Sequence, residues 1–486
     1  ELMTSITFRA KLLMTGSAGS QRGDPEHSLR PHVRARGLPM QLTRRAFMVG
    51  LAASAATVPL AACSPGSRTT ASTSGGAGKA SGVIKVAAFE NAYGAAIYKQ
   101  VAEAFEKATG AKVELTVSKT IDQELTPQVA AGNFPDVVFM GVGGKTGFTD
   151  KFVQNKSLEP LNDILKITNK GETTTIGDKL LPGMVGNLTT NPYDDDRLML
   201  APTFMAPAGL VYNKTLFTKN GWTLPATWDE FFALGDEVKA KGVSLFTYPT
   251  AGYFDTFFFA LLSSIGGDDY FKKVMSYEKN IWTGSEATQA LNLVGKLLTQ
   301  YTLPQTVGYA NNQDYTKNQA ALMADKALFC PDGSWVAGEM KDAPRSAGFA
   351  WGLTTVPAMK KEDRHLTSFI ESVWIPSGAK NKASAKTFIA WLYSDKATGL
   401  FAKAGAAMPT KTGTKGLPAE VAPFYTVYDE PGLKSTIGGF KSAKAVPGID
   451  MKTALLDSVD SVASGKLSVK DWQAKVNEAS NKLGGY

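Results

Sequence analysis

The stretch after residue 82 alternates between two hydrophobic periods, and this alternation predicts strands and helices in turn. Residues 83–89 form an apolar run rich in β-formers, and the next apolar positions recur at helical spacing until Gly110. The same order repeats as a strand, an amphipathic helix and a strand, at residues 112–117, 120–131 and 135–140. A βαβαβ order predicts a parallel sheet that binds its ligand beyond the carboxyl ends of the strands. The loops at 89–94 and 140–144 are therefore expected to face one crevice.

The rest of the chain predicts a second α/β unit. A strand is expected at 209–214, and a helix begins after Thr227, because Thr227 and Glu230 have the spacing of a capping box. The other expected elements are strands near 245–249, 326–330 and 369–375, helices through most of 230–345, one helix at 380–403 and two helices at 450–485.

Before this body, the chain carries the pattern of an export signal. Residues 1–39 show no hydrophobic periodicity, and we interpret them as upstream leader sequence before a start at Met40. Arg44 and Arg45 precede an uncharged, weakly apolar run at 46–62, which is the order of a twin-arginine signal. A membrane-spanning helix is the alternative, but the run is short and diluted by small and polar residues for a span of about 20 residues.

A lipid anchor is predicted directly after this signal. Leu60-Ala61-Ala62-Cys63 resembles a lipobox, which implies that 40–62 is a signal peptide cleaved before Cys63 and that Cys63 is acylated. Residues 63–82 are rich in Ser, Thr, Gly and Ala and are expected to form a flexible tether. We expect the body to be exported and held by lipid on the outer face of the cytoplasmic membrane. Cys330 then has no partner and is expected to be a small buried apolar side chain.

Composition and charge narrow the function classes. With 43% hydrophobic and 20% charged residues, the chain of 486 residues is neither a disordered nor a polytopic membrane protein, and its length predicts two or three domains. Most of the net charge of +8 comes from the first 62 residues. The near-neutral body has no basic run with interleaved aromatic residues, so nucleic-acid binding is not expected.

Catalytic motifs are scarce in the body. His365 is its single histidine and sits in a charged run that predicts exposure to solvent. Gly-x-Ser-x-Gly does not occur in residues 63–486, and no Cys/His cluster has metal-ligand spacing, so we expect no metal and no cofactor. A glycosidase needs only two carboxylates, and the sequence leaves that alternative open.

Four ordered segments carry a family resemblance: AGNFPDVVFM (131–140), GLVYNKTLFTKNGWTLPATWDEF (209–231), FCPDGSWVAGEMK (329–341) and AAMPT (406–410). They resemble the solute-binding proteins of ATP-driven carbohydrate importers, the group related to maltose-binding protein. The similarity is strongest to actinobacterial binders of the N-acetylglucosamine/chitobiose type, in FCPDGSW and in Glu371, five residues before Pro376.

This resemblance implies an α/β, two-lobed periplasmic-binding-protein fold of the clamp-like type II, with a hinge of three crossovers. The N-lobe is expected at 83–204 and 355–405, and the C-lobe at 205–354 and 406–486. The crossovers are expected near 203–207, 353–358 and 404–408. The implied partners are a carbohydrate, two permease subunits and a cytoplasmic ATPase, with a monomeric binding protein that reaches the membrane only through its lipid anchor.

Sugar sites combine aromatic platforms with planar polar groups, because pyranoses have apolar C–H faces bordered by hydroxyls. In the C-lobe, the resemblance implies that Trp335 stacks on the ligand beside Asp332, which could instead cap a helix. It also points to Tyr253 and Phe254, for which core packing is the alternative.

In the N-lobe, the family places polar contacts on the loop after the first strand, here Glu90, Asn91 and Tyr93. The absence of Trp from 141–144 moves the expected stacking role to Tyr93. Glu371 and Ser372 lie in an otherwise apolar strand, where a carboxylate is costly unless paired, so they are candidate site groups or a buried partner for a lysine or an amide. Phe204, at the first crossover, belongs either to the hinge packing or to the cleft wall.

The function expected from the sequence is capture of a small mono- or oligosaccharide between the lobes, followed by delivery to a permease, without catalysis. Two alternatives remain: an exported carbohydrate-active enzyme, and a clamp for a charged solute such as a polyamine or a peptide.

Overall fold

A computed structural model describes residues 80–144, 146–193 and 195–486. The predictions for the export signal, for Arg44 and Arg45 and for Cys63 lie outside these residues. None of the helices that the structure describes is both long and apolar enough to cross a membrane.

The described residues form one mixed sheet with strand order β2-β1-β3-β8-β4-β6-β5, in which β7 also pairs with β4 and β9 with β8. The strands are β1 Val83–Phe89, β2 Lys112–Ser118, β3 Val137–Phe139, β4 Ala201–Asn213, β5 Ser244–Phe246, β6 Ala327–Gly333, β7 Trp351–Thr354, β8 His365–Trp374 and β9 Lys434–Thr436. The helices are α1 Ala96–Thr109, α2 Ile121–Ala130, α3 Phe148–Gln154, α4 Ile176–Lys179, α5 Lys214–Asn220, α6 Trp228–Lys239, α7 Asp255–Met275, α8 Ser285–Gln300, α9 Thr316–Met323, α10 Val336–Glu339, α11 Lys382–Leu392, α12 Asp395–Lys403, α13 Ala422–Tyr425, α14 Met451–Leu455, α15 Val459–Ala463 and α16 Val469–Gly484.

The first lobe, here the N-lobe, is built on β1, β2 and β3. Both β2 and β3 pair with β1 in parallel, which confirms the βαβαβ prediction. Helix α1 buries one apolar stripe, including Val101 and Phe105, and ends where Gly110 takes φ 80°, a backbone conformation that favours glycine. Helices α11 and α12 pack beside α1. Because β1 and β3 are parallel, their carboxyl ends lie at the same edge of this lobe. The loops that carry Asn91 and Gly141 follow these two strands.

The second lobe, here the C-lobe, is built on β5, β6 and β7 with the helices of the α5–α9 and α14–α16 regions. Helix α6 begins with the predicted capping box. The Thr227 hydroxyl accepts from the Glu230 amide, and the Glu230 carboxylate accepts from the Thr227 amide. Strand β6 pairs with β4 and ends at Gly333, two residues before Trp335. The residue order of the FCPDGSW segment therefore places Trp335 at the end of a C-lobe strand.

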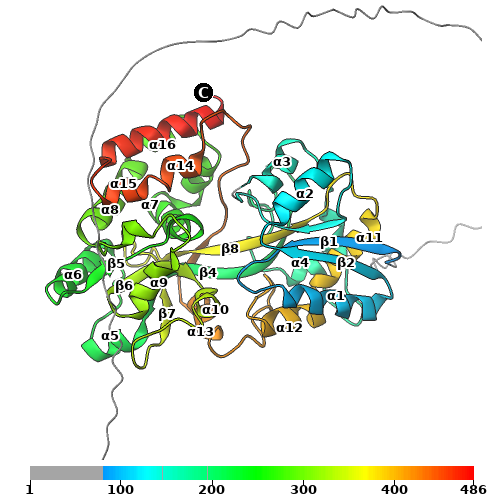
Figure 1. The fold of residues 1–486 in the computed structure, drawn as a ribbon, viewed down its shortest axis with the longest axis horizontal. Coiled ribbons are helices and arrows are strands. Elements are labelled where there is room, and N and C mark those ends of the chain that lie inside the picture. Colours follow the sequence, from blue (N-terminus) through cyan, green and yellow to red (C-terminus); the bar gives the residue numbers. More distant parts are fainter. Residues whose placement is uncertain (1–79, 145, 194) are drawn as a thin grey trace, which may run out of the picture. The chain divides into compact units, whose positions relative to one another are not determined.

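Two long strands, β4 and β8, join the lobes, and Figure 1 shows them side by side between the two groups of helices. Strand β8 pairs with β3 of the N-lobe at Val373 and Trp374, and with β9 at its other end. The chain therefore crosses between the lobes within β8, whereas residue Ala358 of the expected crossover pairs with the C-lobe. The exact lobe boundaries stay a prediction.

The C-terminal elements differ from the sequence-based expectation. The single helix predicted at 380–403 is two helices, because the chain turns at Ser394, whose side chain caps α12 by accepting from the Ala397 amide. The two helices predicted at 450–485 are three. Side-chain caps at Ser394 and Ser468 set the starts of α12 and α16, which the hydrophobic period alone did not indicate.

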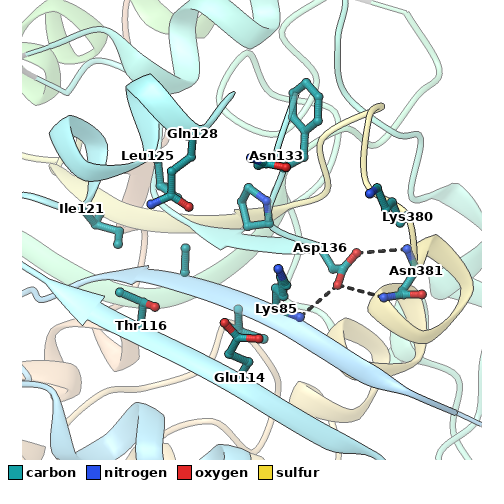
Figure 2. A pocket seen from close by; sticks show the side chains of 14 residues that line it. Lys85, Glu114, Thr116, Ile121, Leu125, Gln128, Asn133, Asp136, Lys380 and Asn381 are labelled. Carbon is teal, nitrogen blue, oxygen red and sulfur yellow. Dashed lines mark hydrogen bonds between the residues drawn. The ribbon is translucent and has the colours of Figure 1, made fainter. Parts of the chain in front are cut away.

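A pocket of about 140 Å³ lies over the middle of β1, where Lys85, Val86 and Ala87 line it. Figure 2 shows its centre, the Asp136 carboxylate, which accepts from the Lys85 amide at 2.9 Å and from the amide and side chain of Asn381 at 3.0 and 3.2 Å. Asp136 is only 2% exposed, so it ties β1 to the start of α11.

Replacing Asp136 with alanine is expected to lower the free energy of unfolding by about 3 kcal/mol, because it leaves buried amides without an acceptor. Chemical denaturation monitored by fluorescence measures this loss. Asp163→Ala is the control, since the Asp163 side chain is mostly exposed and its ion pair with Lys386 is expected to contribute less than about 1 kcal/mol. Equal effects of the two variants would contradict the prediction.

Candidate functional site

One face of β8 is open where the strand passes between the lobes. Side chains alternate along a strand, and here Phe369 is exposed and Glu371 half-buried, whereas Ser368, Ile370 and Ser372 on the other face are buried. The strand β4 places the small residue Ala206 opposite Phe369. Two residues span about 6.6 Å along a strand, so Phe369 and Glu371 present an aromatic ring and a carboxylate at nearly the width of a sugar ring.

Aromatic rings of the C-lobe gather beside Phe369. The Trp335 ring lies edge-to-face with Phe369, with ring centroids 5.7 Å apart, and with Tyr253 at 6.2 Å. Tyr315 contacts Tyr253 at 5.4 Å. The Trp335 ring packs directly over Gly333, where an added Cβ would come within 2.2 Å of it. A glycine is needed there, so the close approach fixes the position of the indole.

A partly buried network around two carboxylates holds these rings in place. Glu339 accepts from the hydroxyls of Tyr253 and Tyr315 at 2.7 Å each and from the amide of Gln319 at 2.7 Å. The same Gln319 nitrogen donates to Asp332 at 2.7 Å. Burial, and then the charge of Glu339, raise the pKa of Asp332, while hydrogen bonds from Gln319, the Gly333 amide and Trp335 oppose the shift. The two carboxylates therefore orient the aromatic rings.

The N-lobe contributes polar groups near Glu371. The Gly141 amide donates to the Glu371 carboxylate at 3.2 Å, and burial raises the pKa of this carboxyl to about 7. Asn91 accepts from the Tyr93 amide at 3.1 Å and donates to the Tyr98 hydroxyl at 3.1 Å. Burial raises the pKa of Tyr93, and the neighbouring Tyr425 and Glu371 add to this shift. The loop after β1 therefore lies close to the carboxylate on β8.

The structure thus brings together Trp335, Tyr253, Glu371, Tyr93 and Asn91 from the set predicted by sequence. Glu90 is half-buried near them, and its amide pairs with the Ser118 carbonyl. The remaining predicted residues turn inward. Asp332 is buried beneath the aromatic rings, Phe254 packs in the C-lobe core, and Ser372 is buried with no hydrogen-bond partner for its hydroxyl.

Phe204 is part of the hinge packing. It occupies a bulge in β4 where the register with β8 shifts, and its φ of 45° is uncommon for a bulky residue. Its buried ring contacts Tyr93 at 5.6 Å, Tyr98 at 6.0 Å and Phe401 at 4.9 Å. Of the two roles considered for Phe204, the contacts favour hinge packing that also supports Tyr93.

Sequence reasoning missed four residues of this cluster: Phe369, Tyr315, Gln319 and Glu339. For three of them, the spacing to a neighbouring residue in the sequence could have indicated a shared face. Phe369 lies two positions before Glu371 and so shares its strand face, and Tyr315 and Gln319 are four positions apart, as neighbours on one helix face are. Glu339 follows Trp335 by the same interval, but nothing in the sequence shows that α9 and α10 meet.

A cavity of about 670 Å³ lies on the other face of β8, which Ser368 lines. Its other residues include Met205, Tyr425, Tyr428 and Thr410. None of the predicted site residues lines it. The Tyr425 hydroxyl donates to the Met205 carbonyl at 2.8 Å. Because Met205 follows the bulge in β4, this cavity lies next to the bulge.

The described residues include one histidine, His365, and one cysteine, Cys330. No group of three or more His, Cys, Asp or Glu side chains is placed to hold a metal ion within residues 80–144, 146–193 and 195–486. The expectation that His365 is exposed is wrong: it begins β8, is 2% exposed, and burial lowers its pKa. Cys330 is buried and unpaired, as predicted.

Comparisons with known proteins agree with this architecture. A relative, the diacetylchitobiose-binding protein NgcE of Streptomyces coelicolor, is 28% identical over 396 residues, which cover 77% of this chain and 81% of the relative. The diacetylchitobiose-binding protein DasA of the same organism is 25% identical over 337 residues, 64% of this chain and 69% of its own.

Solved structures share the fold. A chitin oligosaccharide binding protein superimposes with a TM-score of 0.64 at 20% identity, covering 84% of this chain and all of the other. Apo RafE from Streptococcus pneumoniae gives a TM-score of 0.64 at 18% identity, covering 83% and 98%. These likenesses confirm the predicted two-lobed type II fold. The family profile described as bacterial extracellular solute-binding protein matches residues 90–399, and the chain therefore belongs to that family.

Proposed function

We propose that this protein captures a small carbohydrate in the cleft along β8 and delivers it to a membrane permease. The observation that carries the proposal is the meeting of side chains from both lobes at one strand face. Trp335 and Tyr253 of the C-lobe supply apolar ring faces, and Glu371, Gly141 and the Asn91 loop supply hydrogen-bonding groups. This combination suits a pyranose, which has apolar C–H faces and a rim of hydroxyls.

Contacts from both lobes are what a clamp requires. A ligand shifts an open–closed equilibrium only by its differential affinity for the closed state, so one-lobe contacts would leave the equilibrium unchanged. Closure along β4 and β8 removes water from the hydrogen bonds to Glu371 and strengthens them. The bulge at Phe204 and the crossing within β8 supply the connection about which the lobes move.

The substrate class that we propose is a neutral oligosaccharide of N-acetylglucosamine units. Two relatives bind diacetylchitobiose, and a chitin oligosaccharide binding protein has the same fold. The carboxylate Glu339 already accepts three hydrogen bonds from protein groups, so it does not call for a cationic ligand. The ligand leaves chemically unchanged.

We further propose that the protein acts as a monomeric lipoprotein. Acylated Cys63 would hold it on the outer face of the cytoplasmic membrane, after export by the signal with Arg44 and Arg45. The closed clamp would then present the rims of both lobes to two permease subunits, which a cytoplasmic ATPase drives. Mass spectrometry of the membrane fraction, which detects the lipid on Cys63, tests the anchor.

A thermal-shift screen of mono- and oligosaccharides on the purified protein, followed by calorimetry, tests the central proposal. Chito-oligosaccharides are expected to raise the melting temperature, with micromolar or tighter affinity and no products after long incubation. Failure of every sugar to protect the protein would overturn it. Product formation would instead favour the enzyme, and affinity that falls steeply with added salt would favour a charged solute.

A further inference from the structure

Phe369 is an apolar side chain left open at the centre of the sheet. It is 39% exposed, and no other phenylalanine of the described residues reaches that exposure. Its strand has neighbours on both edges, and every other residue of β8 except Glu371 is buried. Because central strands are ordinarily covered, this ring presents apolar surface to the cleft rather than to the outside of the protein.

The Phe369 ring forms one wall of a corner between two aromatic rings. The Trp335 ring meets it at 68° with centroids 5.7 Å apart, and Tyr253 stands behind Trp335 at 66°. Gly333 beneath the indole and the hydrogen bond of Tyr253 to Glu339 fix this wall. On the other side, Ala206 is too small to cover the phenyl ring. The exposed Phe369 ring therefore meets an indole of fixed position at 68°.

We propose that the Phe369–Trp335 corner selects pyranoses that carry an N-acyl substituent over otherwise identical plain pyranoses. A flat sugar face covers one ring and leaves the second wall without an apolar partner. An acetamido group projects from the sugar ring and gives the second wall a methyl group to bury. Glu371, about 6.6 Å along the same strand face, accepts from the amide N–H or a hydroxyl. This inference rests on the proposed carbohydrate function and names the specificity element of that site.

The experiment compares two disaccharides with the same β1,4 linkage, N,N′-diacetylchitobiose and cellobiose, by calorimetry on the wild type and three variants. Phe369→Ala removes one wall, and Phe369→Tyr keeps the ring. Met359→Ala is the matched control, because Met359 is a similarly exposed apolar side chain, at 38%, outside the cleft cluster. Melting temperatures establish that each variant folds.

The wild type is expected to prefer the acetylated disaccharide by at least tenfold. Phe369→Ala is expected to weaken diacetylchitobiose at least tenfold and cellobiose no more than threefold, whereas Phe369→Tyr and Met359→Ala keep the preference. Equal losses for both sugars, or no loss, would overturn the selectivity proposal while leaving the carbohydrate function intact. A wild type that binds neither these nor other sugars would instead overturn the proposed function itself.

Discussion

Replacing Trp335 with alanine is expected to weaken sugar binding at least a hundredfold and to abolish the ligand-induced thermal shift. Trp335 is the ring that both Tyr253 and Phe369 contact, so its removal takes the centre out of the aromatic cluster. Large aromatic side chains at the centre of a binding site are the usual positions of such losses, since they contribute the most buried area. Calorimetry with diacetylchitobiose measures the effect.

Two further variants separate the role of Trp335 from a general loss of stability. Trp222→Ala removes an indole that packs on Phe217 and donates to Glu237 in the C-lobe, away from the cleft cluster, and is expected to leave affinity unchanged. Gly333→Ala keeps the indole but forces it to move, because the new methyl group would overlap the ring, so binding should weaken more than tenfold. Full affinity of the Trp335 variant would remove this residue from the site.

The sequence predicted those parts of the fold that local patterns determine. The parallel N-lobe sheet followed from the alternation of strand and helix periods, and α6 from the capping box at Thr227 and Glu230. Trp335 and Tyr253 were predicted as site residues through a family resemblance, and Glu371 through the cost of a carboxylate in an apolar strand. Each of these signals lies within a few residues of the feature that it predicts.

The remaining features depend on contacts between distant segments. His365 lies in a charged run, but pairing with β9 and with Val356 buries it at the start of β8. Phe254 and Tyr253 are adjacent in sequence, and only the packing of α7 decides which ring enters the core. Glu339 on α10 accepts from Tyr315, the N-cap of α9, although the two residues are 24 positions apart. Local periodicity does not indicate which distant segments come into contact.

Sugar affinity is expected to rise about tenfold between pH 6 and pH 8. Burial raises the pKa of Glu371 to about 7, so the carboxyl is largely protonated at pH 6 in the ligand-free protein. Hydroxyl and amide donors of a sugar favour the ionised form, so binding lowers this pKa and releases a proton. Calorimetry at several pH values, in buffers of different ionisation enthalpy, measures both the slope and the proton count.

Glu371→Gln is the control that assigns the slope, because it keeps the size of the side chain and removes the titration. Burial also raises the pKa of Asp332, Asp255 and Asp460, so the wild-type profile alone would not identify the group.

The stability of the ligand-free protein provides an independent check of the sign. A carboxyl with a raised folded-state pKa contributes stability that is present below its unfolded pKa of about 4.3 and lost as the pH rises through about 7. The variant should therefore lose less stability than the wild type over that range and bind sugar with a flat pH profile. A slope that survives in Glu371→Gln would assign it to another carboxyl.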